Sequence, residues 1–149
     1  MNGLIPPKLM DIINEFELSE GREKIELLLQ YADQMPLLPE HIQKQHKAMD
    51  FVEECMTPVY VTAEKDGNGL HFYFDVPAES PTVRGYAAIM AIGLDGTTPN
   101  QILNLPNDFY QLMGLDQVLT MQRLNGITAI LAHMKRIALE ALRGDISQV

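Results

Sequence analysis

Residues 58–76 read P-V-Y-V-T-A-E-K-D-G-N-G-L-H-F-Y-F-D-V, with an apolar side chain at every second position on either side of a polar centre. This alternation is typical of two strands that each bury one face. The centre, Asp66-Gly67-Asn68-Gly69, holds residues that tolerate a positive φ, as a tight turn requires. The segment therefore predicts an antiparallel hairpin.

The residues before the hairpin extend the predicted sheet. Met49 to Glu53 could form a third strand, which would leave Cys55 on a tight loop between two strands. Helical patterns lie on both sides of this sheet in the sequence. The order indicates an α+β fold, in which a small three-stranded antiparallel sheet has helices packed on one face. We find no internal repeat or linker, and expect residues 1–149 to form a single domain.

The helices are predicted from apolar spacing and from proline, serine, threonine and glycine at their ends. Ser19 is expected to be an N-cap, and residues 40–50 an exposed connection with one helical turn. The first expected helix begins at Pro6-Pro7. The others run from Ser19 to about Gln34, from Ser80-Pro81 to Gly96, in two short pieces from Thr98-Pro99 and from Pro106 to Gly114, and from Thr120 to Arg143.

Charge and hydropathy exclude several classes of function. The formal net charge of −9 disfavours binding to nucleic acid or to an anionic membrane. No apolar run approaches the ~20 residues of a membrane-spanning helix, and the N-terminus lacks the basic start of a signal peptide. We expect a cytoplasmic protein, or a plastid stromal one if a transit peptide has been removed.

Cys55 is the only cysteine in the chain, so an intramolecular disulfide and a paired-cysteine metal site are excluded. The four histidines do not show the close spacing of zinc ligands, and no metal site is predicted. A cysteine hydrolase would need a histidine base, for which His71 and His133 are the candidates. Glu53 and Glu54 beside the thiol favour its protonated form. The structural alternative is that Cys55 is a small buried apolar side chain.

Several motifs in order resemble the SufE family, the sulfur acceptors of iron-sulfur cluster assembly. They are I-P-P-K-L-M-D-I-I-N-E-F, M-P-L-L-P-E, V-E-E-C-M-T-P-V-Y-V, T-V-R-G-Y-A-A-I-M-A, T-T-P-N-Q-I-L and Q-R-L-N-G-I. The resemblance extends from about Leu4 to Leu142 and implies a SufE/NifU-like version of the α+β fold.

The resemblance implies that Cys55 takes persulfide sulfur from a SufS-like, PLP-dependent cysteine desulfurase. Cys55 would then deliver it to a SufBCD-like scaffold. On this interpretation the protein is a sulfur-transfer accessory protein that stimulates the desulfurase, not an enzyme. It needs no cofactor of its own, because PLP belongs to the desulfurase.

The candidate residues for partner binding or support of the cysteine loop are Glu54, Met56, Thr57, Arg84, Arg123 and Asn125. For the last three the same resemblance implies the role. Arg84 and Arg123-x-Asn125 stand at the family's R-G and R-x-N-G motifs, where a basic group could hold a thiolate or persulfide anion. The arginines could instead cap loops or pair with carboxylates.

The cysteine loop departs from the family pattern. Family members usually have G-C-Q-S at the cysteine and a tryptophan where this chain has Tyr60, whereas this chain has Glu54-Cys55-Met56-Thr57. Glutamate in place of glycine restricts the loop and adds negative charge beside the thiol.

The runner-up hypothesis is a regulatory module that docks on the desulfurase or scaffold without carrying sulfur. The sequence is compatible with a monomer or a homodimer.

Overall fold

The structure is a computed structural model that describes residues 2–144. Six α-helices and a three-stranded antiparallel sheet make up this part of the chain, so the predicted α+β class is confirmed. The α-helices are α1 Pro7–Leu18, α2 Arg22–Ala32, α3 Glu40–Lys44, α4 Pro81–Gly93, α5 Pro99–Leu103 and α6 Met121–Leu142. Short 3₁₀ turns cover Asn2–Leu4, His46–Ala48, Phe109–Met113 and Leu115–Gln117.

The sheet has the strand order β1 (Asp50–Phe51), β2 (Tyr60–Asp66) and β3 (Gly69–Asp75). The predicted hairpin is present, with Tyr60 opposite Asp75 and Asp66 opposite Gly69. The predicted third strand over 49–53 is shorter, because only two of its residues pair with β2. The chain between β1 and β2 therefore carries Cys55, as predicted.

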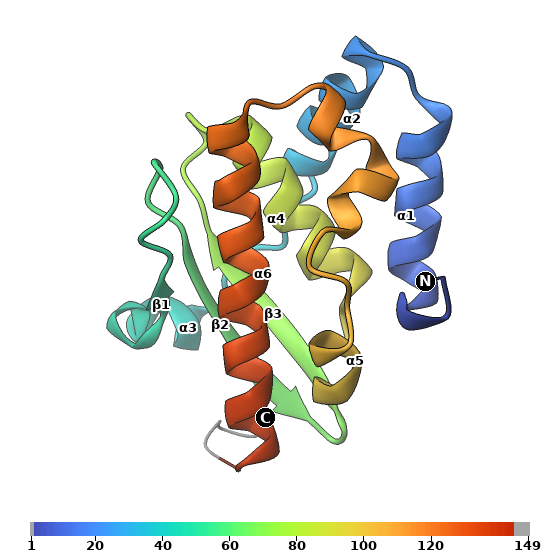
Figure 1. The fold of residues 1–149 in the computed structure, drawn as a ribbon. Coiled ribbons are helices and arrows are strands. Elements are labelled where there is room, and N and C mark those ends of the chain that lie inside the picture. The colour runs from blue at the N-terminus through green and yellow to red at the C-terminus, as the bar shows by residue number, and fades with distance from the viewer. Residues whose placement is uncertain (1, 145–149) are drawn as a thin grey trace.

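Helices α4 and α6 cover the inner face of the sheet, as Figure 1 shows. Apolar side chains at alternate positions of β2 and β3, such as Val61 and Phe74, are buried against them. Gly85 lets α2 and α4 approach closely, because a Cβ there would lie 2.1 Å from the backbone oxygen of Leu28. The glycine in the middle of α4 thus has a packing reason.

The junction of α1 and α2 differs from the prediction. Ser19 is not an N-cap: it follows the end of α1, and its Oγ donates a hydrogen bond to the backbone oxygen of Glu15 at 3.0 Å. Gly21, with a φ of 52°, is the N-cap of α2. The buried Lys24 ammonium donates to the backbone oxygens of Phe16 and Ser19, which satisfies carbonyl groups at the end of α1. The chain therefore turns at Gly21, two residues after the predicted cap, before α2 begins.

Residues 40–50 were predicted as an exposed connection with one helical turn, and α3 is that turn. The segment also makes specific contacts with the outer face of the sheet. The Nε2 atoms of His41 and His46 lie 2.7 and 2.8 Å from carboxylate oxygens of Glu64 and Asp75, respectively. The His46 ring also packs on Tyr60. The segment is therefore attached to the sheet at two points.

The helix-end signals after the sheet are mostly confirmed. Thr98 and Thr120 both accept a hydrogen bond from the third residue of the helix that follows, as N-caps do. However, α4 ends at Gly93 and not at Gly96. Gly96 has a φ of 78°, and its amide donates to the backbone oxygen of Leu70 at 2.8 Å. It therefore belongs to a turn that pairs with the edge of β3.

Candidate functional site

The candidate site is built on the loop of residues 52–59 between β1 and β2. Its base is closed by a hydrogen bond from the Val52 amide to the Val59 oxygen at 2.9 Å, and both side chains are fully buried. These apolar anchors turn the loop inward, so that only 9% of Cys55 is exposed. Met56, by contrast, is 80% exposed. Val52 and Val59 thus anchor the two ends of the loop in the core, whereas Met56 faces solvent.

The thiol lies against α6. Cys55 Sγ donates a hydrogen bond to the backbone oxygen of Gly126 at 3.4 Å. A Cβ at position 126 would lie 3.3 Å from that sulfur, closer than ordinary van der Waals contact. The glycine of the R-x-N-G motif therefore makes room for the thiol in its closed position.

The surroundings of the thiol favour its protonated form. Burial, and secondarily the negative charge of Glu54, raise the pKa of Cys55 to about 11. The direction of the effect of Glu54 agrees with the sequence-based expectation. In this closed arrangement the thiol is a poor nucleophile, because the thiolate is the reactive form.

A cavity of about 340 Å³ opens beside the sulfur, between the cysteine loop and the first turns of α4 and α6. Cys55, Met56, Thr57 and Arg123 all line it. The Arg123 side chain is exposed, and no hydrogen-bond acceptor within residues 2–144 engages its guanidinium. The cavity thus places an available cation near the only thiol.

Two side-chain contacts attach the loop to the walls of this cavity. The Thr57 and Ser80 hydroxyl oxygens are 2.6 Å apart, which ties the loop to the start of α4. The Gln122 Nε2 donates to the Met56 sulfur at 2.7 Å, which ties it to α6. Sequence reasoning missed Ser80 and Gln122. Ser80 does precede α4 as predicted, but its hydroxyl bonds to Thr57 and makes no capping hydrogen bond.

Three of the predicted site residues lie outside the cavity lining. Arg84 donates to the backbone oxygen of Val76 at 2.5 Å, which is the loop-capping role left open by the sequence. Asn125 is exposed on α6, and Glu54 points toward His133 on the same helix. The structure therefore brings together Cys55, Met56, Thr57 and Arg123.

Neither candidate histidine is placed as a base for the thiol. His71 bonds through its two ring nitrogens to Asp95 and Asp66, at 2.6 and 3.4 Å. The Nε2 of His133 lies 3.2 Å from Glu54 Oε1. Among residues 2–144, the backbone oxygen of Gly126 is the sole hydrogen-bond partner of the sulfur. The cysteine-hydrolase hypothesis therefore has no support in this geometry.

The described part of the chain lacks a metal-ligand cluster and a membrane-spanning helix. No three histidine, cysteine, aspartate or glutamate side chains of residues 2–144 are grouped as metal ligands would be. Over the same residues, no helix has both the length and the apolar character needed to cross a membrane.

Comparison with known proteins agrees with this fold. Residues 10–138 match the family model described as SufE, Fe-S metabolism associated domain. An uncharacterized SufE-like protein of Mycobacterium tuberculosis is 38% identical over 92% of this chain and 95% of that protein. The solution structure of a hypothetical protein from Thermus thermophilus, 33% identical, superposes with a TM-score of 0.82 over 93% of this chain and 98% of that one. The chain belongs to the SufE family.

More distant relatives carry names that refer to a function or a location. A protein of Escherichia coli named sulfur acceptor protein CsdE is 28% identical over 76% of this chain and 75% of its own length. A SufE-like protein 1 of Arabidopsis thaliana, named chloroplastic/mitochondrial, is 32% identical over 91% of this chain but only 36% of its own length.

Proposed function

We propose that this protein is a sulfur carrier. Cys55 takes the outer sulfur of a persulfide on a PLP-dependent cysteine desulfurase and hands it to an iron-sulfur cluster scaffold. The observation that supports this most is a lone thiol on a short loop beside a cavity, in a member of the SufE family. One relative is named a sulfur acceptor protein and another, from Plasmodium vivax, a cysteine desulfuration protein.

The reaction is a thiol–persulfide exchange. The Cys55 thiolate attacks the outer sulfur of the donor persulfide, so that one S–S bond forms while the donor S–S bond breaks. The donor leaves as a thiolate and takes up the proton that Cys55 gave to solvent. No external oxidant or reductant is needed. With no second cysteine in the chain, the new persulfide cannot collapse to an intramolecular disulfide.

The closed loop has to open when the protein docks on its partner, and Arg123 can then act on the exposed thiol. The buried thiol cannot meet a donor persulfide unless the loop moves outward. Once it does, the Arg123 guanidinium at the cavity is available to stabilise a thiolate or persulfide anion. The protein then acts as an accessory of the desulfurase in a reducing compartment, the cytoplasm or a plastid stroma.

The direct test is to incubate the protein with cysteine and a desulfurase and to analyse it by mass spectrometry. We expect a ~32 Da adduct on Cys55 that a reductant removes, since one sulfur atom is added to the thiol. Cys55→Ser is the control and should carry no adduct. Absence of the adduct with several desulfurases would overturn the proposal.

A second function is favoured by the burial and high pKa of the thiol, which make it a poor acceptor at rest. In this alternative the protein docks on the desulfurase or scaffold and regulates it without carrying sulfur. Cys55→Ser separates the two functions. If the protein is a carrier, Cys55→Ser still binds the desulfurase but no longer stimulates it. If the protein is a regulatory module, Cys55→Ser keeps both binding and stimulation.

A further inference from the structure

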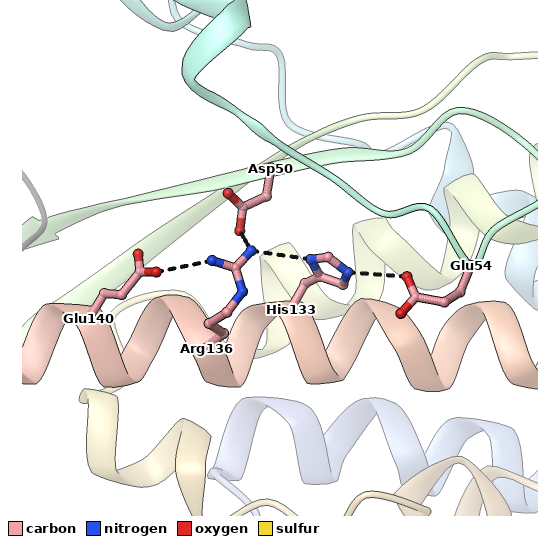
Figure 2. A network of polar contacts seen from close by, with 5 residues as sticks. All are labelled: Asp50, Glu54, His133, Arg136 and Glu140. Carbon is pink, nitrogen blue, oxygen red and sulfur yellow. Dashed lines mark hydrogen bonds and ion pairs between the residues drawn. The ribbon is translucent and has the colours of Figure 1, made fainter.

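A polar network connects the cysteine loop to α6, and Figure 2 shows its five residues. At one end the Glu54 carboxylate, next to Cys55 in the chain, lies 3.2 Å from His133 Nε2. At the other end Arg136 pairs with Asp50 of β1 and, at 3.0 Å, with Glu140 of α6. Both ends of the segment from β1 to the cysteine are thus attached to one face of α6.

Arg136 orients the imidazole between the two ends. Its Nη2 lies 3.5 Å from His133 Nδ1, and because a guanidinium can only donate, Nδ1 accepts. The neutral ring then carries its proton on Nε2, where it donates to Glu54. Arg136 is itself held by the carboxylates of Asp50 and Glu140. The His133 side chain is only 17% exposed, which limits the other orientations that its ring can adopt.

We propose that His133 is a positioning residue that holds the cysteine loop closed through its hydrogen bond to Glu54. This inference rests on the proposed carrier function, because it concerns how the acceptor thiol is exposed. Glu54 immediately precedes Cys55, so a movement that turns the sulfur out of its contact with Gly126 also carries Glu54 away from His133. The bond at 3.2 Å must therefore break each time the thiol becomes accessible.

The contribution of this bond is modest, because 57% of the Glu54 side chain is exposed. Exposed ion pairs and hydrogen bonds of this kind change an equilibrium about two- to fivefold. This hydrogen bond therefore favours the closed loop only modestly, so the loop can still open. Glu54 is what gives His133 a partner on the loop.

The test measures the rate at which iodoacetamide alkylates Cys55 at pH 8 in the isolated protein. His133→Leu keeps the bulk of the side chain but removes the donor, and should raise the rate about two- to fivefold. His133→Gln can still donate to Glu54 and should return the rate toward that of the wild type. Glu54 remains in both variants, so its charge beside the thiol is unchanged.

His41→Leu is the matched control, since His41 makes the same kind of bond to Glu64 on β2 but does not touch the cysteine loop. It should leave the alkylation rate unchanged. Urea unfolding of every variant identifies a general loss of stability. The inference is overturned if His133→Leu reacts at the wild-type rate, if His133→Gln reacts as fast as His133→Leu, or if His41→Leu reacts equally fast.

No desulfurase takes part in this assay. If the His133 inference fails, the expectation of a persulfide adduct on Cys55 is therefore unaffected. Conversely, a missing adduct with a positive alkylation result would overturn the carrier function alone.

Discussion

The raised pKa of Cys55 leads to a quantitative prediction about its reactivity. Burial and Glu54 raise this pKa from 9.0 to about 11. At pH 8 the thiolate fraction is then about 0.1%, compared with about 10% for an unperturbed thiol, because each pKa unit is a factor of ten. A more basic thiolate is more nucleophilic, which offsets the 100-fold difference by about 6- to 10-fold. We expect Cys55 to react at least ~10-fold more slowly than a free thiol, before any steric protection.

The assay is the alkylation rate of Cys55 as a function of pH from 7 to 11.5, followed by mass spectrometry. The wild-type rate should keep rising above pH 9, with its midpoint near pH 11. Glu54→Gln keeps an oxygen that can accept from His133 but removes the charge. Its midpoint should fall yet stay above 9.0, because burial is the larger of the two causes. A wild-type midpoint at or below 9.0, or a Glu54→Gln midpoint equal to 9.0, would refute this reasoning.

Three further predictions test packing, the cavity and a histidine pair. Gly85→Ala should lower the urea midpoint by an amount equivalent to about 2 kcal/mol, since a Cβ lying 2.1 Å from the Leu28 oxygen outweighs the ~1 kcal/mol gain in helix propensity. An unchanged midpoint would show that α2 and α4 separate freely. Arg123→Ala should slow persulfide formation on Cys55 several-fold while the urea midpoint stays constant, and an unchanged transfer rate would remove Arg123 from the site. The hydrogen bond that His71 donates to the Asp95 carboxylate raises the pKa of His71 above 6.5, so this pair stabilises the fold below that pH and loses its effect as the pH rises through the raised value. The unfolding free energies of the wild type and Asp95→Asn should therefore differ more at pH 6 than at pH 9, and a difference that does not depend on pH would contradict this account.

Each of these variants has a control in the same chain. Gly3→Ala adds a Cβ where nothing lies within 4 Å, and should not change the urea midpoint. Asn125→Ala alters an exposed side chain two residues from Arg123 on α6, outside the cavity lining. Asp116→Asn removes an exposed carboxylate that pairs with no histidine among residues 2–144.

The parts of the fold that could be predicted from the sequence depend on neighbouring residues. The hairpin follows from alternation around Asp66–Gly69, and the N-caps at Thr98 and Thr120 follow from residues three positions apart. The predictions failed where another residue supplies the turn or the pairing. Gly21 and not Ser19 precedes α2, and pairing with Leu70 places Gly96 in a turn beyond the end of α4.

The candidate site shows the same limit. The position of Cys55 between two strands followed from local patterns, as did the unfavourable charge of Glu54. The contacts that hold the loop closed join positions 23, 66 and 79 residues apart, namely Thr57 to Ser80, Met56 to Gln122 and Glu54 to His133. Pairs this distant leave no periodic signal in a single sequence, because each depends on how α4 and α6 cross the sheet.

The burial of Cys55 against α6 couples the exposure of its thiol to the ionisation of that thiol. Burial is the larger cause of the rise in the Cys55 pKa from 9.0 to about 11 and is lost when the loop is out, whereas Glu54 stays beside the thiol. Deprotonation therefore favours the outward loop by up to about 100-fold. By the same linkage, any surface that merely draws the loop out also acidifies the thiol. Such a surface needs no base of its own. On the proposed carrier function, a site without a histidine near the sulfur can in this way present a thiolate when it docks.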